Sequence, residues 1–289
     1  ISIQLRLNSA LLTAAAEQAP SNVTTPSPIP MESFASFEGG KDIIEQLFTH
    51  PDQPELFCEI ATMSENKCGM GVAAYNGKIF CVGGYGRTEC LKSVASYCPI
   101  ANKWTEERNL KEARGRVNVA LIDNALYIVG GSNGVNELDT VECLPLDPSQ
   151  DEKVKWKKCE NLPFARSNGG VCALNGKVYC IGGNATGQNS VKDCHVFCPE
   201  TNTWTSIAPL NTGRCQAGVV AFDGKLWVAG GSDSWNCLNT VECYDPVEDK
   251  WSFVAPLSQS RRGCGLAVLN SRIYCVGGSD GSQSLKSTE

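Results

Sequence analysis

The chain has 289 residues and a formal net charge of −6, with 42% hydrophobic and 19% charged residues. This balance is typical of a globular protein and leaves room for one repeat domain plus a tail. A nucleic-acid-binding surface needs clustered Lys and Arg, which this acidic chain does not offer. No apolar run approaches the ~18 residues that a membrane span requires. We therefore expect neither nucleic acid nor membrane as a partner.

Residues 1–56 predict a low-complexity linker rather than a folded domain. Residues 10–30 are rich in Ala, Ser, Thr and Pro, a composition that buries too little apolar surface to offset the entropy of ordering. Residues 41–48 could form one or two helical turns. The opening residues have some features of a secretory signal, but a start Met is missing and the apolar core is short. We expect a disordered linker here.

Glycine doublets organise the rest of the chain. They occur at positions 83/84, 130/131, 182/183, 230/231 and 277/278, at intervals of 47, 52, 48 and 47 residues. The first four are each followed by a tryptophan: Trp104, Trp156, Trp204 and Trp251. A period near 50 built from short β-type segments indicates a propeller or a solenoid. Residues 57–63 align with residues 251–257 as the closing strand of an earlier unit.

Each unit predicts a hairpin followed by a buried strand. Full units begin near Ser64, Lys111, Phe164 and Asn211, and a fifth begins near Ser258 and ends at Glu289 within its third strand. Asn-Gly or Asp-Gly at 76/77, 175/176 and 223/224 predicts tight two-residue turns, and 123/124 and 270/271 are weaker turn formers. The strand that follows is almost continuously apolar, which predicts burial on both faces between stacked sheets.

These residues resemble kelch repeats. The resemblance lies in the doubled glycine, the spaced tryptophan, and an aromatic residue before an Asp-Pro or Cys-Pro turn at Tyr97, Phe197 and Tyr244. It implies an all-β fold over residues 57–289, a kelch-type β-propeller that is incomplete, with about five of six four-stranded blades and a truncated last blade. The runs GYGRTECLKSVASYCP and SWNCLNTVECYDP further resemble the BTB-kelch group.

The resemblance to the BTB-kelch group has implications for binding partners and for cellular location. It implies a fragment of a longer protein that binds actin or another protein, with a role as a substrate adaptor of a cullin ubiquitin ligase. It also implies a cytoplasmic location, extending to the cytoskeleton and nucleus. Oligomerisation is expected only through a BTB domain, which these residues do not contain. That part of the expectation rests on fold-level analogy.

The sixteen cysteines mostly occupy apolar positions of the repeat. Cys81, Cys180 and Cys275 align with Ile128 and Val228, which favours reduced, buried thiols. The alternatives are a disulfide scaffold or a zinc site. No CxxC pair occurs, so we expect no metal and no cofactor. Two other cysteines, Cys68 and Cys215, align with polar loop positions and are expected to be exposed.

We expect no enzyme and no catalytic residue. Only two histidines occur, and His195 aligns with Glu142 and Glu242 on a strand, which favours a structural role. Neither a nucleophile elbow nor a phosphate-binding loop is present. The rival interpretation is a secreted, disulfide-linked propeller with an adhesive or enzyme-like function. Free-thiol counting on unfolded protein separates the two, because the reduced form has close to sixteen thiols.

Two sets of polar loop positions differ from blade to blade, which suits recognition of an asymmetric partner. One set surrounds a recurrent basic residue before each first strand, and the other follows each glycine doublet. The recurrent arginines have a second interpretation, in which they brace neighbouring blades. The candidate partner-binding residues are Tyr85, Arg87, Arg114, Arg116, Ser132, Asn133, Arg166, Ser167, Asn168, Arg214, Gln216, Asp233, Trp235, Arg261, Arg262 and Asp280.

Overall fold

The computed structural model describes residues 61–146 and 155–289. The predicted linker over residues 1–56, and residues 57–60 of the predicted closing strand, lie outside the described residues. The described part is all-β, and every strand pairing in it is antiparallel. The fold class expected from the repeats is confirmed.

Four sheets have four strands each, and we call them blades 1 to 4. Blade 1 contains β1 (Gly71–Tyr75), β2 (Lys78–Val82), β3 (Val94–Cys98) and β4 (Lys103–Glu106). Blade 2 contains β5 (Asn118–Ile122), β6 (Ala125–Val129), β7 (Val141–Pro145) and β8 (Lys157–Lys158). Blade 3 contains β10 (Gly170–Leu174), β11 (Lys177–Ile181), β13 (Cys194–Cys198) and β14 (Thr203–Ile207). Blade 4 contains β15 (Gly218–Phe222), β16 (Lys225–Ala229), β17 (Val241–Asp245) and β18 (Lys250–Val254).

A fifth sheet, blade 5, pairs β19 (Gly265–Leu269) with β20 (Arg272–Val276). Its third strand begins at the end of the chain, where Thr288 bridges Val276 and Glu289 exchanges two backbone hydrogen bonds with Cys275. The fifth unit therefore ends inside its third strand, as the repeat alignment predicted. A small ribbon of β9 (Arg166–Ser167) and β12 (Asn184–Ala185) lies beside blade 3.

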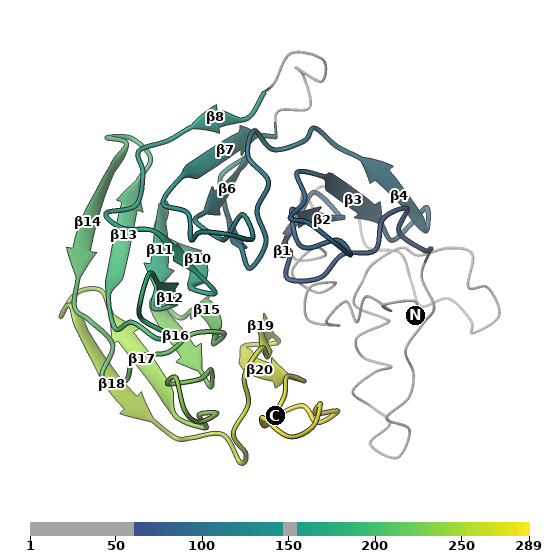
Figure 1. The fold of residues 1–289 in the computed structure, drawn as a ribbon. Coiled ribbons are helices and arrows are strands. Elements are labelled where there is room, and N and C mark those ends of the chain that lie inside the picture. The colour runs from purple at the N-terminus through teal and green to yellow at the C-terminus, as the bar shows by residue number, and fades with distance from the viewer. Residues whose placement is uncertain (1–60, 147–154) are drawn as a thin grey trace, which may run out of the picture.

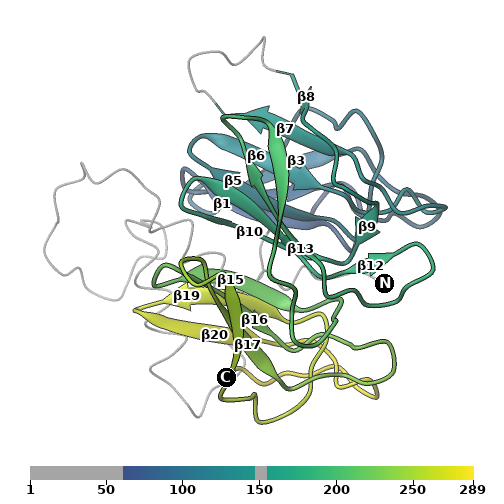
Figure 2. The ribbon, with the colours of Figure 1, turned by 90° about the vertical axis from the view of Figure 1, so that its left-hand side faces the viewer.

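The blades are arranged around a common axis, as Figure 1 shows. The first strand of each blade contacts the first strand of the next, in the series β1, β5, β10, β15 and β19. Their close approach explains the glycine at the start of β1, β10 and β15: a Cβ on Gly170, for example, would lie 2.0 Å from Val219 Cγ2. This is the geometry of a β-propeller, with the first strands innermost. In Figure 2, β9 and β12 lie on one side of the molecule, where loops of other blades also project.

The hairpin turns form where the sequence predicted them. Asn76 and Gly77, Asn175 and Gly176, and Asp223 and Gly224 all have positive φ between 49° and 70°. The weaker turn formers also reach this region, at Asp123, Asn270 and Ser271. Asn and Asp tolerate it because their short polar side chains form local hydrogen bonds.

The hydrophobic core lies between blades rather than inside any of them. One cluster joins blades 1 and 2, a second joins blades 2 and 3, and a third joins blades 3 and 4. The predicted apolar cysteine positions Cys81, Cys180 and Cys275 are all buried, and Cys180 belongs to the second cluster. The fifteen cysteines among the described residues are free thiols.

The recurrent tryptophans tie each outer strand to the preceding blade. Trp251 Nε1 donates to Ala208 O at 2.9 Å, while Asp249 Oδ1 accepts from Ala208 N at 2.8 Å. Ala61 makes the same two contacts with blade 1, to Trp104 Nε1 and Asn102 Oδ1. Ala61 therefore contacts blade 1 in the same way as Ala208 of blade 3 contacts blade 4. This is the place predicted for the closing strand of an earlier blade.

Candidate functional site

The recurrent arginines are buried inside the blades. Arg114, Arg166, Arg214 and Arg261 have at most 1% of their surface exposed. Arg214 donates from Nη1 to Gly230 O at 2.8 Å and from Nη2 to Glu242 Oε1 at 2.6 Å. Its own carbonyl accepts from Gly183 N of blade 3 at 2.9 Å. Each arginine therefore connects its own second and third strands to the preceding blade.

An acid completes this arrangement in three blades, and it is buried in blades 2 and 4. Glu142, Glu242 and Glu289 pair with the arginines of blades 2, 4 and 5 at 2.8, 2.6 and 2.5 Å. In blade 3 the acid is replaced by His195, whose Nδ1 lies 2.9 Å from Arg166 Nη2. Burial, together with the nearby Arg166 charge, lowers the pKa of His195 to about 4, so the imidazole is neutral near pH 7.

The structure therefore removes several candidates from the binding surface. A partner cannot contact a side chain that has no exposed surface, and the bracing interpretation explains the four arginines. Ser132 and Ser167 are also buried, with 5% and 1% exposed, because their backbones pair the two loop sets within a blade. Cys215 was expected to be exposed with Cys68, but it is buried because it pairs with Ser232 across this junction.

The remaining candidates lie on a rim formed by two loops from each blade. We call the loops before the first strands the entry loops and those after the second strands the tip loops. Within a blade they are joined by backbone bridges, such as Gly115 with Ser132 and Arg262 with Ser279. The tip loops comprise residues 85–90, 132–137, 184–189, 232–237 and 279–284.

The entry loops are also linked to one another around the axis. Asn168 N donates to Arg116 O at 3.0 Å, Gln216 N to Asn168 O at 2.9 Å, and Gly263 N to Gln216 O at 2.8 Å. All these residues, and Gly69 of blade 1, have positive φ between 49° and 64°. Arg116 and Gln216 are long side chains in a backbone region that favours glycine, and strain of this kind concentrates at functional sites. Both side chains are exposed.

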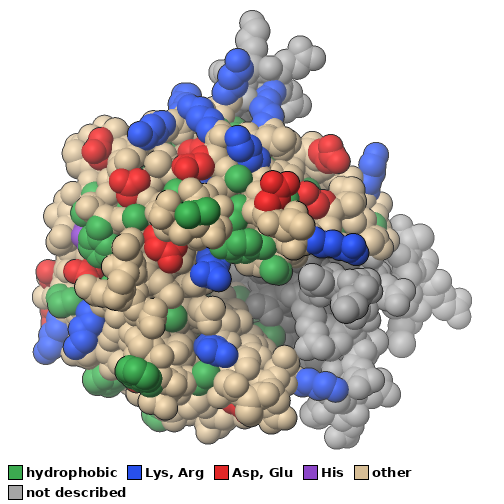
Figure 3. Space-filling view, in the orientation of Figure 1, with side chains coloured by type: hydrophobic (Ala, Val, Ile, Leu, Met, Phe, Trp, Pro, Cys, Tyr) green, Lys and Arg blue, Asp and Glu red, His purple; other side chains and the backbone are tan. Residues whose placement is uncertain are grey.

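The tip loops carry exposed apolar side chains. Trp235 is 91% exposed, and Val135, at the equivalent position of blade 2, is 88% exposed. Three other candidates support these loops: the side-chain oxygens of Asn133, Asp233 and Asp280 each accept two backbone N–H groups of their own loop. These hydrogen bonds lower the pKa of Asp280 to about 2. The rim face mixes apolar, acidic and basic side chains (Figure 3).

Neighbouring tip loops contact each other at most junctions. Cys90 Sγ of blade 1 lies 3.1 Å from Ser132 O of blade 2, and Ser190 Oγ, directly after the blade 3 tip loop, lies 2.7 Å from Ser234 Oγ of blade 4. The junction between blades 2 and 3 differs, because the blade 3 loop closes early through a bridge between Ala185 and Gln188. An open pocket of about 360 Å³ lies there.

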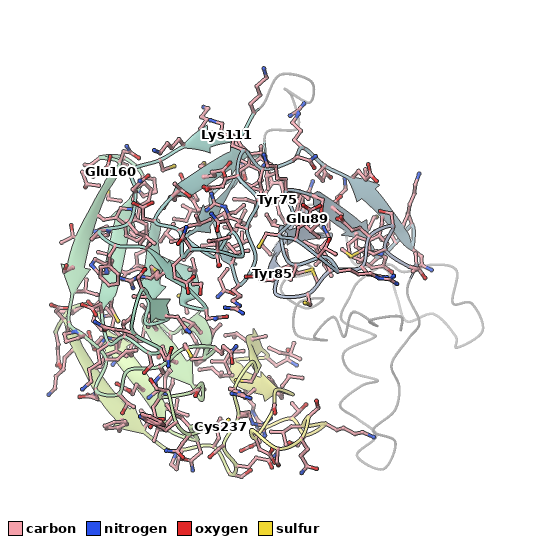
Figure 4. All side chains as sticks on the ribbon, in the orientation of Figure 1. Tyr75, Tyr85, Glu89, Lys111, Glu160 and Cys237 are labelled. Atoms are coloured by element: carbon pink, nitrogen blue, oxygen red, sulfur yellow. The ribbon has the colours of Figure 1, made fainter. Side chains whose placement is uncertain are left out.

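Polar residues dominate the pocket lining. Tyr85 and Arg116 contribute from the side of blades 1 and 2, and the Arg116 guanidinium carbon lies 5.6 Å from the centre of the Tyr85 ring. Figure 4 places Tyr85 near the centre of the ring of blades, in contrast to Glu160 at the periphery. Glu137 and Asn184 line the pocket from blades 2 and 3. Their atoms Glu137 Oε2 and Asn184 Oδ1 are buried and have no hydrogen-bond partner among the described residues.

The sequence had indicated Tyr85, Arg116 and Ser132 of this pocket as candidates, but not Glu137 or Asn184. A signal was present in the sequence, because Glu137 occupies the position that Cys90 and Cys237 hold in blades 1 and 4.

A second concavity of about 420 Å³ lies at the outer edge of blades 2 and 3, lined by Lys158, Cys159, Glu160, Asn161 and Asn202. Nothing in the described ranges groups three or more His, Cys, Asp or Glu for a metal ion. Within the same ranges, no helix is long and apolar enough to cross a membrane.

This fold and rim define a kelch-type β-propeller, and the chain belongs to the kelch-repeat family. The family described as the KLHDC2/KLHL20/DRC7 Kelch-repeats domain matches residues 117–288, and the Kelch motif matches residues 67–111. The solved "Structure of YjhT" shares the fold, with a TM-score of 0.68, 15% identity, and coverage of 79% of this chain and 82% of that one.

The relatives are BTB-kelch-type proteins. The human Influenza virus NS1A-binding protein is 40% identical over 186 residues, which cover 64% of this chain and 28% of that protein. Kelch-like protein 26 of Danio rerio is 30% identical over 214 residues, covering 72% of this chain and 33% of that protein. The chain thus spans about a third of the length of the curated relatives it matches.

Proposed function

We propose that the rim of this propeller binds a protein partner and that the chain carries out no catalysis. The observation that carries this proposal is the contrast between a repeated framework and unlike, at least partly exposed side chains at equivalent rim positions. Arg116, Asn168 and Gln216 occupy one such position, and Val135 and Trp235 occupy another. Binding residues concentrate on loops held by a rigid scaffold, and an exposed tryptophan is an efficient contact.

Actin is the partner we propose to test first, with a substrate of a cullin ubiquitin ligase as the alternative. Both follow from the resemblance to the BTB-kelch group, and with them we propose a location in the cytoplasm, at the cytoskeleton or in the nucleus. Association of two copies would come from a BTB domain elsewhere in a longer protein. These assignments are proposals about the parent protein.

Cosedimentation with filamentous actin tests the rim and the partner together. We expect the wild type to sediment with filaments, Trp235→Ala to weaken the affinity about tenfold or more, and Arg116→Ala with Arg262→Ala to weaken it at low salt. Phe253→Ala is the matched control, because Phe253 is 55% exposed but lies on the outer strand β18.

The outcomes separate the alternatives. If Phe253→Ala abolishes sedimentation and Trp235→Ala does not, a blade edge binds the filament and the rim proposal is wrong. If the wild type stays in the supernatant, actin is excluded. A photoreactive residue at position 235, compared with one at position 253, then tests in cells whether the rim contacts a protein.

A further inference from the structure

The pocket between blades 2 and 3 departs from the repeat in its chemistry. At the equivalent position of blades 1 and 4, a cysteine fills the junction with the following tip loop: Cys90 Sγ lies against Ser132 O, and Cys237 Sγ lies 3.3 Å from the position of a Cβ on Gly281. Blade 2 has Glu137 there, and the neighbouring loop of blade 3 closes early. An acidic side chain thus lines a pocket at this junction, in place of a thiol that packs against the next loop.

Two residues that line this pocket, one from blade 2 and one from blade 3, each have an acceptor atom without a donor. Glu137 Oε2 and Asn184 Oδ1 are both buried without a hydrogen bond among the described residues. A buried polar atom without a partner costs free energy, and the cost is larger for a charged group. Both atoms are enclosed, so a ligand group has to insert between the two side chains to supply donors to them and recover this cost.

From this arrangement, we infer that the pocket lined by Glu137 and Asn184 accepts a basic side chain, lysine or arginine, of a protein partner. An ammonium group has three donors and a guanidinium has five, with no acceptor on either, which complements two unpaired acceptors. Charge complementarity with the Glu137 carboxylate favours a cation over a neutral donor. The inference rests on the proposed rim function and specifies the chemistry of one part of the partner.

Arg116 distinguishes a basic occupant from an acidic one, because it is the cationic residue in the pocket lining. Its guanidinium carbon lies over the Tyr85 ring at 5.6 Å, and no ion pair joins it to Glu137 within the described part of the chain. If the pocket accepted an acidic side chain instead, Arg116 would be the attracting group. Removing Arg116 therefore has opposite effects under the two assignments.

Short peptides test the pocket directly on the whole chain. The probes are acetyl-Gly-Gly-Xaa-Gly-Gly-amides with lysine, arginine, norleucine or glutamate at the centre, titrated against amide NMR signals of residues 132–137 and 184–189. We expect the lysine and arginine peptides to shift these signals, and the norleucine and glutamate peptides to leave them unchanged. Glu137→Gln should weaken the response about tenfold, as the loss of one charge-assisted hydrogen bond predicts.

Two further variants test whether the response depends on the Glu137 side chain in a folded protein and on the sign of the charge in the pocket. Glu137→Cys restores the residue found in blades 1 and 4 and should abolish the response while the remaining amide spectrum stays that of the folded protein. Arg116→Ala should preserve or strengthen the response to the lysine peptide, since it removes a repelling charge. Loss of the lysine response in Arg116→Ala would contradict the inference.

Other outcomes overturn it as well. Equal responses to lysine and norleucine peptides, a response to the glutamate peptide alone, or no response to any peptide each reject a basic side chain as the occupant. If the lysine peptide fails while Trp235→Ala still weakens filament binding, the pocket inference is wrong and the rim proposal stands. If the lysine peptide fails and filament binding is abolished by Phe253→Ala but not by Trp235→Ala, the rim proposal is rejected too.

Discussion

At the scale of single residues, blade 3 shows why a buried arginine can have a neutral partner. In blade 2, Glu142 accepts hydrogen bonds from the backbone N–H groups of Lys111 and Glu112 as well as from Arg114. The position of Lys111 is held in blade 3 by Pro163, which has no N–H to donate. A carboxylate at position 195 would lose that donor, so the neutral imidazole of His195 suits its surroundings better.

The same site makes the stability of blade 3 sensitive to acid. The pKa of His195 is about 4 in the folded chain, against an ordinary value of 6.5, because burial and the charge of Arg166 oppose protonation and Asp193 only partly offsets them. A lowered histidine pKa means that the unfolded chain binds the proton more readily. The stabilisation is therefore complete above about pH 6.5 and is lost as the pH falls toward 4.

Urea unfolding between pH 7 and pH 4 measures this effect. We expect the wild type to lose about 2 to 3 kcal/mol more than His195→Gln over that range, because glutamine can accept from Arg166 but does not titrate. The comparison removes contributions that both proteins share, including those of the acidic side chains. Equal losses in the two proteins would show that His195 is not the responsible group.

At the scale of structural elements, the entry loops form a continuous hydrogen-bonded series from blade 1 to blade 5. Gly69 and Gly263 occupy the left-handed backbone position in blades 1 and 5, whereas the blades between them have Arg116, Asn168 and Gln216. A left-handed conformation costs a non-glycine residue about 1 to 2 kcal/mol. The middle blades keep larger side chains at a cost in stability, which is consistent with a role for those side chains in binding.

Substitution of Gln216 separates stability from binding. Gln216→Gly relieves the left-handed strain but adds chain entropy to the unfolded state, so we expect a net gain of up to about 1 kcal/mol in the free energy of unfolding. Gln216→Val should cost more than about 1 kcal/mol, because a β-branched residue fits this region poorly. Denaturant unfolding of the three proteins gives the order. A glycine variant less stable than the wild type would show that Gln216 makes a stabilising contact.

Elements that depend on local chemistry were predictable from the sequence, and those that depend on distant partners were not. Asn76 and Gly77 form the predicted turn because the dipeptide itself favours the required φ angles. The burial of Arg214 was ambiguous, since its acid partner Glu242 is 28 residues away along the chain. The pocket at Glu137 results from a contact that blade 3 does not make, and no short sequence pattern encodes such a difference.

At the scale of the whole molecule, every hydrophobic cluster spans two blades. Leu226 and Tyr244 of blade 4 belong to the same cluster as Tyr179 and Cys194 of blade 3. Arginine carbonyls and tryptophan indoles add hydrogen bonds between consecutive blades. A single blade therefore cannot bury its own apolar faces, and stability is a property of neighbouring pairs, as in other repeat architectures.

Because neighbouring blades share their clusters, we expect a destabilising substitution in one blade to destabilise the adjacent blade as well. Leu226 is completely buried, and Leu226→Ala should cost about 2 to 5 kcal/mol through lost burial and the cavity left behind. Because the cluster is shared, amide hydrogen exchange should show lost protection in β11 and β13 of blade 3 as well as in β16 and β17 of blade 4, while β2 of blade 1 stays protected. Val247→Ala is the control, since Val247 is 94% exposed. Lost protection confined to blade 4 would mean that the blades are stable independently, and equal loss in all blades would mean that the propeller unfolds as one unit.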